Sequence, residues 1–504
     1  MEKVLIFDTT LRDGEQAAGG NLTIQEKLRI AKQLEKLNVD IIEAGFPVSS
    51  QGEFEAVSLI SQEVKWSVVC ALAHANQKAI DRAWEAIKGA DRPRIHVFLS
   101  TSRIHQEYQL KMTPSQILEL ASDMVKHARS LAEDVEFSPM DATRTDPEYL
   151  CRILEASIEA GATTVNIPDT VGYDTPGSYG RLIKNIFRSV PNIGKAVVSC
   201  HCHNDLGLAA ANSLEAVLAG ARQVECTVNG IGERAGNASL EEVVMAIKTR
   251  RDVFEQVETG IKTVQIYPTS RMVSELTGFA VQANKAIVGD NAFRHESGIH
   301  QDGILKKRET YEIMDPRELG IPGTTLEVGK LSGRHALKER LLELGYDLTD
   351  EEFNDFYRAF KELADKKKKI ADKDIESLVA EEQRAKSGAY RLERIQVSCG
   401  DQGLATAAVK ISTKDGTILS DAAIGTGPVD AAYKAINRLL DGPDNLVEFT
   451  VKSVTEGIDA IGSVLVRLES EGEIFTGRGT DTDIIVASAK AYINALNRAR
   501  AKKE

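Results

Sequence analysis

The stretch A-V-V-S-C-H-C-H-N-D, residues 196–205, combines an apolar run with a polar end. Its first residues are apolar or small, a pattern typical of a strand that is buried on both faces. Because side chains two apart on a strand point to the same face, His201 and His203 are able to reach one metal ion. A second interpretation fits equally well: one histidine is a core group and the other faces solvent. The rest of the chain must decide between them.

Seven more apolar, β-branched runs recur along the first half of the chain. They lie at 4–8, 40–46, 67–72, 94–100, 135–138, 163–167 and 222–228. Helical patterns separate them, for example at 24–37 and at 147–160, where Pro147 stands near the first turn. Alternation of this kind predicts a parallel sheet, and eight repeats between residues 4 and 228 predict a closed (β/α)8 barrel.

Polar residues stand at or near the ends of these runs, where such barrels carry their chemistry. The set includes Asp13, Glu43, His74, His96, Asp141, Asn166, Asp169, His201, His203 and the loop 229–237. Strands with a purely structural role more often have apolar residues there, so we expect an active site at this face. Two imidazoles, a carboxylate from Asp13 and an amide oxygen would suit Mn²⁺, Mg²⁺ or Zn²⁺. Taken alone, the run D-G-E-Q at 13–16 would instead indicate a turn at Gly14.

The bulk properties exclude several classes of protein. A net charge of −13 does not favour a nucleic-acid or anionic-membrane surface. The six cysteines form no C-x-x-C pair, which is typical of a reducing compartment. The chain has no run of about 18 apolar residues and no leader pattern at its start, so we expect a cytoplasmic protein.

At 504 residues the chain is too long for one ordinary core, and its pattern changes along its length. We predict a catalytic barrel at 1–270, linker subdomains at 271–390 and a third domain at 391–504. The third domain contains a weak repeat of an alternating strand, a G-x-G element and an Ala-rich helix. The two copies lie at 407–411, 425–427 and 430–438, and at 463–468, 477–479 and 487–498. A duplicated α+β unit indicates a pseudo-symmetric ligand or dimer module.

The loop N-G-I-G-E-R-A-G-N, residues 229–237, is rich in glycine but lacks the spacing G-x-G-x-x-G of a dinucleotide site. A nicotinamide-dependent dehydrogenase therefore has no support in the sequence. Phosphate binding at the N-terminus of the next helix stays open.

Four motifs together resemble the 2-isopropylmalate synthases, which belong to the acetyl-CoA-dependent Claisen condensing enzymes. Homocitrate, citramalate and benzylmalate synthases are relatives. The motifs are D-T-T-L-R-D-G-E-Q (8–16), H-C-H-N-D-L-G (201–207), N-G-I-G-E-R-A-G-N (229–237) and S-G-I-H-Q-D-G (297–303). Their order is that of the family, and the resemblance covers the whole chain.

The resemblance implies a site and an assembly. The divalent metal would be held by Asp13, His201, His203 and Asn237, and it would chelate a 2-oxo acid. Arg12 would stabilise the charge that develops on the reacting carbonyl, and His300 and Tyr311 would reach the site from the partner subunit. The substrate-binding residues would be Arg12, Glu43, Leu72, His74, His96, Ser138, Met140, Asn166 and Thr170, with Thr170 binding the carboxylate. A homodimer with swapped linker segments follows, as does a leucine-binding regulatory domain at 391–504.

Three features depart from the family pattern. Met140 stands where the family usually has a glutamate of the catalytic group, His74 stands where an arginine is common, and 17–20 is a run of small residues. Methionine cannot move a proton, so His300 becomes the natural candidate for the base.

These departures leave more than one substrate open. We expect 3-methyl-2-oxobutanoate, which would give 2-isopropylmalate in the first step of leucine biosynthesis. An apolar Met140 and a roomier loop would also admit a larger or aromatic acid such as phenylpyruvate. A non-catalytic paralogue that senses an amino acid through 391–504 is the remaining alternative.

Overall fold

The structure of the protein is a computed structural model. It describes residues 1–501 except 322–324, 327–332, 345, 347, 368–369, 371, 373, 376–377, 380–388, 401–402, 441–444, 454–461 and 471–472.

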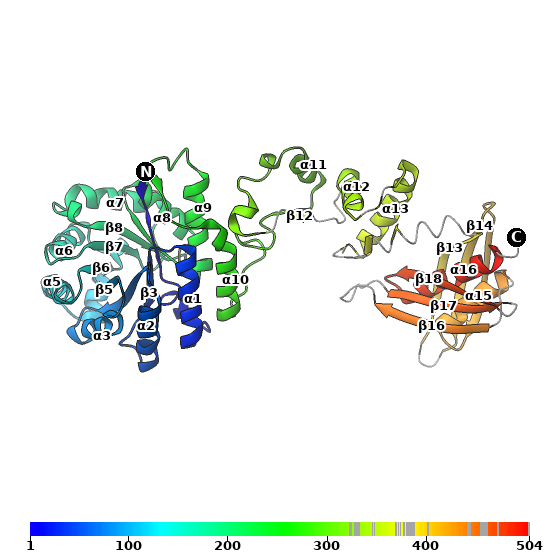
Figure 1. Ribbon diagram of the computed structural model, residues 1–504, viewed down its shortest axis with the longest axis horizontal. Coiled ribbons are helices and arrows are strands. Elements are labelled where there is room, and N and C mark those ends of the chain that lie inside the picture. The colour runs from blue at the N-terminus through cyan, green and yellow to red at the C-terminus, as the bar shows by residue number, and fades with distance from the viewer. Residues whose placement is uncertain are drawn as a thin grey trace. The chain divides into compact units, whose positions relative to one another are not determined.

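Eight parallel strands close into a barrel in chain order, with helices around it (Figure 1). The strands are β2 (Leu5–Asp8), β3 (Ile41–Gly45), β4 (Val68–His74), β5 (Pro93–Ser100), β6 (Asp134–Met140), β7 (Thr164–Asp169), β8 (Val197–Cys202) and β9 (Gln223–Cys226). All eight predicted runs form strands, so the prediction of a (β/α)8 barrel is confirmed. β4 and β6 extend further than predicted, which places His74 and Met140 at the ends of strands.

The main helices of this part alternate with the strands, and the first five of them begin at a residue whose side chain caps the helix. They are α1 (Ile24–Leu37), α2 (Gln51–Glu63), α3 (Gln77–Ile87), α5 (Pro114–Leu131), α6 (Pro147–Glu159), α7 (Pro176–Ser189), α8 (Ala209–Leu218), α9 (Leu240–Thr249) and α10 (Ile266–Thr277). Thr23 and Glu26 form a reciprocal capping box that begins α1. Pro147 is the first residue of α6, where its missing N–H has no cost. A short helix α4 (Arg103–His105) and a parallel pair, β1 (Glu2–Lys3) with β10 (Val257–Glu258), complete this part.

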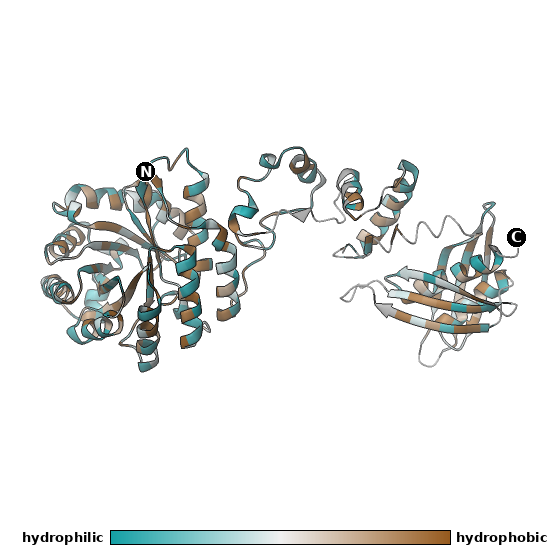
Figure 2. Cartoon of the chain, in the orientation of Figure 1, coloured by the Kyte–Doolittle hydropathy of each residue, from teal (hydrophilic) through white to brown (hydrophobic). Residues whose placement is uncertain are grey.

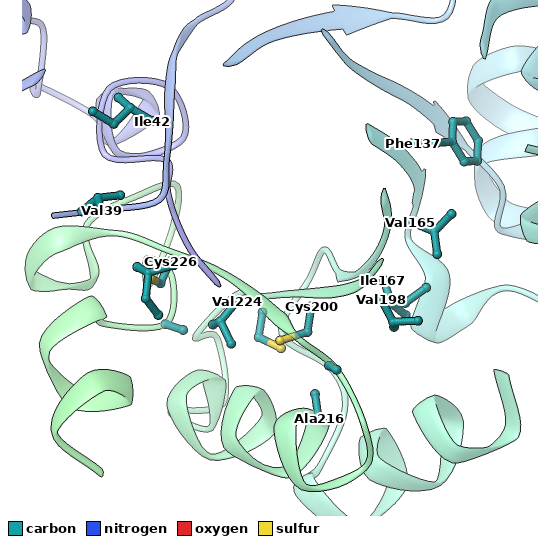
Figure 3. Packing of buried hydrophobic residues seen from close by; sticks show 14 of the residues in the cluster. Val39, Ile42, Phe137, Val165, Ile167, Val198, Cys200, Ala216, Val224 and Cys226 are labelled. Atoms are coloured by element: carbon teal, nitrogen blue, oxygen red, sulfur yellow. The ribbon is translucent and has the colours of Figure 1, made fainter. Parts of the chain in front are cut away.

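Alternation along each strand separates the core from the site. On β8, Cys200 and Val198 point outward and pack against the helices, and Figure 3 shows Cys200 and Val224 directed toward Ala216 of α8. The opposite face of the same strand carries His201 into the barrel. The helices are correspondingly two-sided, with apolar residues toward the strands and polar residues outside (Figure 2).

The chain divides into two compact units. The first comprises residues 1–294 and 312–324, and the second comprises residues 295–311 and 325–504. Along the chain, the elements that follow the barrel and precede the C-terminal sheets are β11 (Arg294–His295), α11 (Gly298–Lys306), β12 (Thr325–Leu326), α12 (Arg334–Glu343) and α13 (Asp350–Lys366). The helices α12 and α13 share a small core of their own around Leu337, Phe356 and Phe360.

The C-terminal repeat is present as two similar halves. Each has a three-stranded antiparallel sheet and one helix: β13 (Tyr390–Ser398), β14 (Ala405–Thr413), β15 (Ile418–Gly425) and α15 (Pro428–Leu440), then β16 (Asn445–Ser453), β17 (Gly462–Ser470), β18 (Glu473–Asp481) and α16 (Ile484–Ala501). The sequence pattern indicated β14 and β17 but missed the first and third strands of each half. No helix among the described residues is long and apolar enough to cross a membrane.

Candidate metal centre and active site

Three of the predicted ligands converge at the C-terminal end of the barrel. Asp13 follows β2, His201 lies in β8 and His203 follows it, and all three are buried. One ligand atom from each lies within 4.8 Å of the others, and Asp13 Oδ2 is 3.8 Å from His203 Nε2. The fourth predicted ligand, Asn237, is bound to this group, because its Nδ2 donates to Asp13 Oδ1 at 2.8 Å. The structure therefore brings the four predicted ligands together.

This donor set fits a cation. Asn237 Oδ1 and His203 Nδ1 are buried and have no hydrogen-bond partner among the residues that the structure describes. Buried polar atoms of folded proteins are nearly always bonded, so an acceptor left over here indicates a missing partner. Gly232 makes room for the group: a Cβ there would lie 2.2 Å from Asn237 Nδ2, and its φ is +155°.

Arg12 connects three carboxylates beneath this set. Its Nη1 donates to Asp13 Oδ2 at 2.5 Å, its Nε to Glu43 Oε2 at 2.5 Å and its Nη2 to Glu225 Oε1 at 2.7 Å. One guanidinium does not balance three carboxylates, so the interior has an excess of negative charge before any histidine is protonated. A divalent cation bound by Asp13 would offset that excess.

The pKa shifts of two of these residues, Asp13 and His203, favour metal binding, whereas the charge of Glu225 outweighs burial and raises the pKa of His201. Burial alone would raise the pKa of Asp13, but the charges of Arg12, His203 and His201 outweigh it and hold that pKa well below its usual range. Burial lowers the pKa of His203 to about 4, and the neighbouring His201 acts in the same direction. Near neutral pH the pair therefore offers a carboxylate and a neutral imidazole, the forms that bind metals.

Below the ligands, six side chains form a closed ring of hydrogen bonds, and five of them were predicted to bind substrate. From Arg12 the ring passes to Glu43, and Glu43 Oε1 contacts His96 Nδ1 at 2.7 Å. His96 Nε2 contacts Ser138 Oγ at 2.7 Å. Asn166 Nδ2 donates to Ser138 Oγ at 3.0 Å and to Glu225 Oε2 at 2.8 Å.

Both oxygens of Glu43 are bonded within the protein, because Thr9 Oγ1 also donates to Glu43 Oε2 at 2.7 Å. Burial alone would raise the pKa of Glu43, but Arg12 and His96 outweigh it and lower that pKa to about 2. Glu43 and His96 are thus placed to orient Arg12 and Ser138 through permanent hydrogen bonds.

A second possible metal group lies deeper, at Glu43, Cys70 and His96. The first and third of these are bonded to each other, and burial raises the pKa of the Cys70 thiol well above its usual value. To bind a metal, Glu43 and His96 would need free lone pairs and Cys70 would need to be a thiolate. We therefore interpret this group as part of the hydrogen-bonded barrel interior and not as a metal site.

The opposite side of the mouth is apolar and aromatic. The ring of Phe98 on β5 meets the ring of His74 at 5.1 Å and the ring of Phe46 at 6.2 Å, both edge to face. Burial lowers the pKa of His74, which favours its neutral form. Leu72 on β4 is 7% exposed, and Met140 at the end of β6 is half-buried. None of these five side chains carries a positive charge that could bind a second acidic group of the substrate.

Thr170 follows β7 and accepts a hydrogen bond from the backbone N–H of Asp141 at 2.9 Å. Its hydroxyl proton is thereby left to donate elsewhere. Asp141 adopts a left-handed conformation, with φ at +68°, and is held by Ser102 Oγ at 2.5 Å and by Arg144 Nε at 2.8 Å. A strained, buried residue at this rim is typical of a functional loop.

His300 and Tyr311 belong to the second unit, where their rings stack with centroids 4.2 Å apart. The two predicted residues therefore lie together.

Glu225 is the main residue of the site that the sequence analysis missed. It is buried on β9, it bonds Arg12 and Asn166, and its Oε1 lies 3.1 Å from His201 Nδ1. A signal was present, since Gln223, Glu225 and Thr227 alternate with apolar residues in the run R-Q-V-E-C-T-V. Period two places all three on the inner face of the barrel.

Comparisons with known proteins agree with this architecture part by part. Residues 3–273 match the HMGL-like family, residues 287–368 match the homocitrate synthase post-HMGL domain-like family, and residues 369–500 match the LeuA allosteric (dimerisation) domain. The fold and the buried ligand set thus define an HMGL-like barrel enzyme with a C-terminal LeuA domain.

Curated relatives extend the match to the whole chain. A 2-isopropylmalate synthase from Synechocystis is 57% identical over 517 residues, covering 100% of this chain and 97% of that protein. One from Carboxydothermus hydrogenoformans is 57% identical over 499 residues, covering 99% and 98%. The chain belongs to the 2-isopropylmalate synthase family, and it is a transferase.

Among solved structures, a hydroxymethylglutaryl-CoA lyase from Pseudomonas aeruginosa is similar to the barrel part. It is 23% identical with a TM-score of 0.48, and the match covers 56% of this chain and 95% of that one.

Proposed function

We propose that this enzyme condenses acetyl-CoA with a 2-oxo acid and releases CoA, with a divalent metal held by Asp13, His201, His203 and Asn237. The observation that carries the proposal is the buried convergence of these four side chains, with the acceptor Asn237 Oδ1 left over. Relatives that are 57% identical over the full length support the reaction class.

A bound cation would polarise the keto carbonyl of the acid. The residues of the chain do the rest. Arg12, fixed by three carboxylates, is placed to stabilise negative charge on the reacting oxygen. The hydroxyl of Thr170 is directed by the Asp141 N–H and is free to donate to the substrate carboxylate.

The reaction needs a base, because the methyl protons of a thioester are very weakly acidic. Met140 at the end of β6 cannot serve. We infer that His300, stacked on Tyr311, takes this proton from its place in the linker of the partner subunit. The methyl carbon then attacks the keto carbon, the alkoxide takes up a proton, and hydrolysis of the thioester releases CoA.

We expect 3-methyl-2-oxobutanoate as the acid, which gives 2-isopropylmalate in leucine biosynthesis. Phenylpyruvate is the second candidate, and the specific observation in its favour is the wall of Phe46, His74, Phe98 and Met140. An apolar wall with a neutral imidazole suits a planar ring better than a charged side chain.

We further propose a homodimer with exchanged linkers and a leucine effector site in the C-terminal module. The match of residues 369–500 to an allosteric dimerisation domain supports a dimer and an effector site. In this arrangement 1–270 is the catalytic barrel, 271–390 completes the partner's site and 391–504 regulates.

A thiol-release assay tests the proposal. The enzyme is loaded with Mn²⁺, Mg²⁺ or Zn²⁺ in turn and given acetyl-CoA with a panel of 2-oxo acids that includes 3-methyl-2-oxobutanoate and phenylpyruvate. We expect CoA release with at least one acid, and its loss in His203→Ala. Absence of release with every acid and every metal would reject the function.

A further inference from the structure

Lys27 in α1 is a buried charge outside the ring described above. It is 1% exposed, and its Nζ donates to Glu15 Oε2 and to both carboxylate oxygens of Glu53, each at 2.8 Å. The two carboxylates are partly exposed, with 19% of the Glu15 side chain and 17% of the Glu53 side chain accessible, but burying the ammonium group itself carries a desolvation penalty that an apolar side chain would avoid. A charged cluster at such a position therefore calls for a role beyond packing.

Each carboxylate of this cluster also holds a loop of the barrel mouth. Glu15 Oε1 accepts from the backbone N–H of Leu22 at 3.0 Å, which closes the loop between β2 and α1. Glu53 Oε1 accepts from the backbone N–H of Phe46 at 3.0 Å, in the loop that follows β3. Lys27 thus joins two loops that are more than twenty residues apart in the chain.

The backbone is shaped for this connection. A Cβ at Gly45 would lie 1.9 Å from Glu53 Oε1, and the φ of Gly45 is +156°. Any other residue at position 45 would push away the carboxylate that links Lys27 to Phe46.

The two loops carry opposite sides of the site. The first contains Asp13, two residues before Glu15. The second positions Phe46, whose ring meets Phe98, and Phe98 pairs with Ser138 across the β5–β6 ladder. The distance between the ligand side and the aromatic wall therefore depends on how firmly the two loops are held.

We propose that Lys27 is a positioning residue, which holds these two loops and thereby sets the space available to the side chain of the 2-oxo acid. The proposal rests on the proposed function for its substrate. Its structural part, the immobilisation of two loops by one buried ammonium group, stands on the hydrogen bonds alone.

The test compares Lys27→Met with Lys32→Met. Lys32 lies on the same helix and pairs with Glu63 of α2 at 2.7 Å, but both side chains of that pair are more than two-fifths exposed. Methionine keeps the length and apolar stem of lysine and removes only the ammonium group. Lys32→Met therefore controls for loss of an α1–α2 ion pair that holds no loop.

Two readouts are needed. Hydrogen exchange, followed by mass spectrometry, should show faster exchange of peptides 14–22 and 46–50 in Lys27→Met only. In the thiol-release assay, KM for the 2-oxo acid should rise on the order of tenfold while kcat and KM for acetyl-CoA stay within about twofold. In Lys27→Arg, whose side chain can still pair with both carboxylates, KM for the 2-oxo acid should lie close to the wild-type value.

If Lys27→Met does not fold, Glu15→Asp and Glu53→Asp take its place, because each keeps the charge and shortens one arm. Glu53→Asp should loosen only 46–50, and Glu15→Asp only 14–22. Hydrogen exchange at the wild-type rate in both loops would overturn the proposal. Changes of equal size in kcat and in the KM of both substrates would also overturn it. A wild-type enzyme that releases no CoA rejects the function instead, and the exchange experiment still decides whether Lys27 holds the loops.

Discussion

At the scale of single residues, the geometry of the site depends on buried carboxylates that hold its other side chains in place. Glu225 and Glu43 fix Arg12 from two sides, and Glu225 also contacts the inner nitrogen of His201. A metal-binding imidazole is oriented by the partner of its other nitrogen, and loss of that partner weakens the metal.

For Glu225→Gln we therefore expect metal affinity to fall about 10- to 100-fold, with the fold retained. Calorimetric titration of Mn²⁺ into the metal-free protein measures it. Glu233→Gln, in the exposed part of the neighbouring loop, is the matched control and should bind as the wild type does. Equal affinity in all three proteins would show that Glu225 does not orient the ligand.

Asp8, at the end of β2, gives the barrel a pH-dependent stability. Burial raises the pKa of this carboxyl from 3.8 to about 7, although hydrogen bonds from Thr10 oppose the shift. The folded protein thus keeps a proton that the unfolded chain releases near pH 4. Stability is therefore lost as pH rises from about 4 to about 7, by up to about 4 kcal/mol.

Asp8→Asn carries no charge at any pH, so its melting temperature should exceed that of the wild type by a margin that grows across this range. Thermal unfolding at several pH values between 4 and 8 measures the margin. Asp252→Asn, at an exposed position, should show no such trend. Parallel profiles for Asp8→Asn and the wild type would contradict the buried proton.

At the scale of elements, the G-x-G motifs of the C-terminal repeat serve packing. A Cβ on Gly477 would lie 2.0 Å from Ala491 O, and one on Gly479 would lie 2.3 Å from Ala487 O. These glycines let α16 lie directly on β18. In the first half, Gly425 has the same role, with Ala431 N at 2.3 Å from its added Cβ.

Gly477→Ala should destabilise the C-terminal module by about 1–3 kcal/mol, because neither backbone can move away without loss of packing. Gly427→Ala is the control, since a Cβ there meets nothing within 4 Å. Denaturant unfolding followed by a fluorophore attached at Cys399, which is exposed, compares the two variants. Equal midpoints would show that the helix adjusts freely.

At the scale of the whole molecule, the cores are separate. The barrel has one large apolar cluster and a small one around Phe7 and Ile41. The C-terminal sheets share a different large cluster, which includes Val464, Val466 and Leu496. Separate cores predict that each part keeps its fold without the other.

A chain ended at residue 390 should therefore retain the barrel, with cooperative unfolding near the wild-type temperature, and lose any shift of that temperature caused by leucine. Circular dichroism and thermal unfolding with and without leucine measure both. An unfolded truncated chain would show that the barrel needs the C-terminal module, and an unchanged leucine effect would place the effector elsewhere.

The sequence determined the barrel and the place of the predicted ligands. Eight apolar runs separated by helical patterns predict the strands, the barrel rule places the residues after them at one end, and the family resemblance singles out Asp13, His201, His203 and Asn237 there. The C-terminal repeat was visible from its alternating strands and Ala-rich helices, although β13, β15, β16 and β18 were not predicted. In β13 the side chains that face the core, such as Leu392 and Ile395, are only half-buried, and a shift in strand register between Leu392 and Arg394 interrupts the alternation.

Only the tertiary structure decided which partner each buried charge has. Residue 225 meets residue 12, and residue 27 meets residues 15 and 53, through the closure of the barrel and the packing of α1 on α2, and not through spacing along the chain. Hydrogen bonds between such groups depend on distances of a few tenths of an ångström, which apolar periodicity does not specify. The convergence of the four predicted ligands could thus be predicted from sequence, whereas the side chains that contact them and the ion pairs that hold the mouth could be found only in three dimensions.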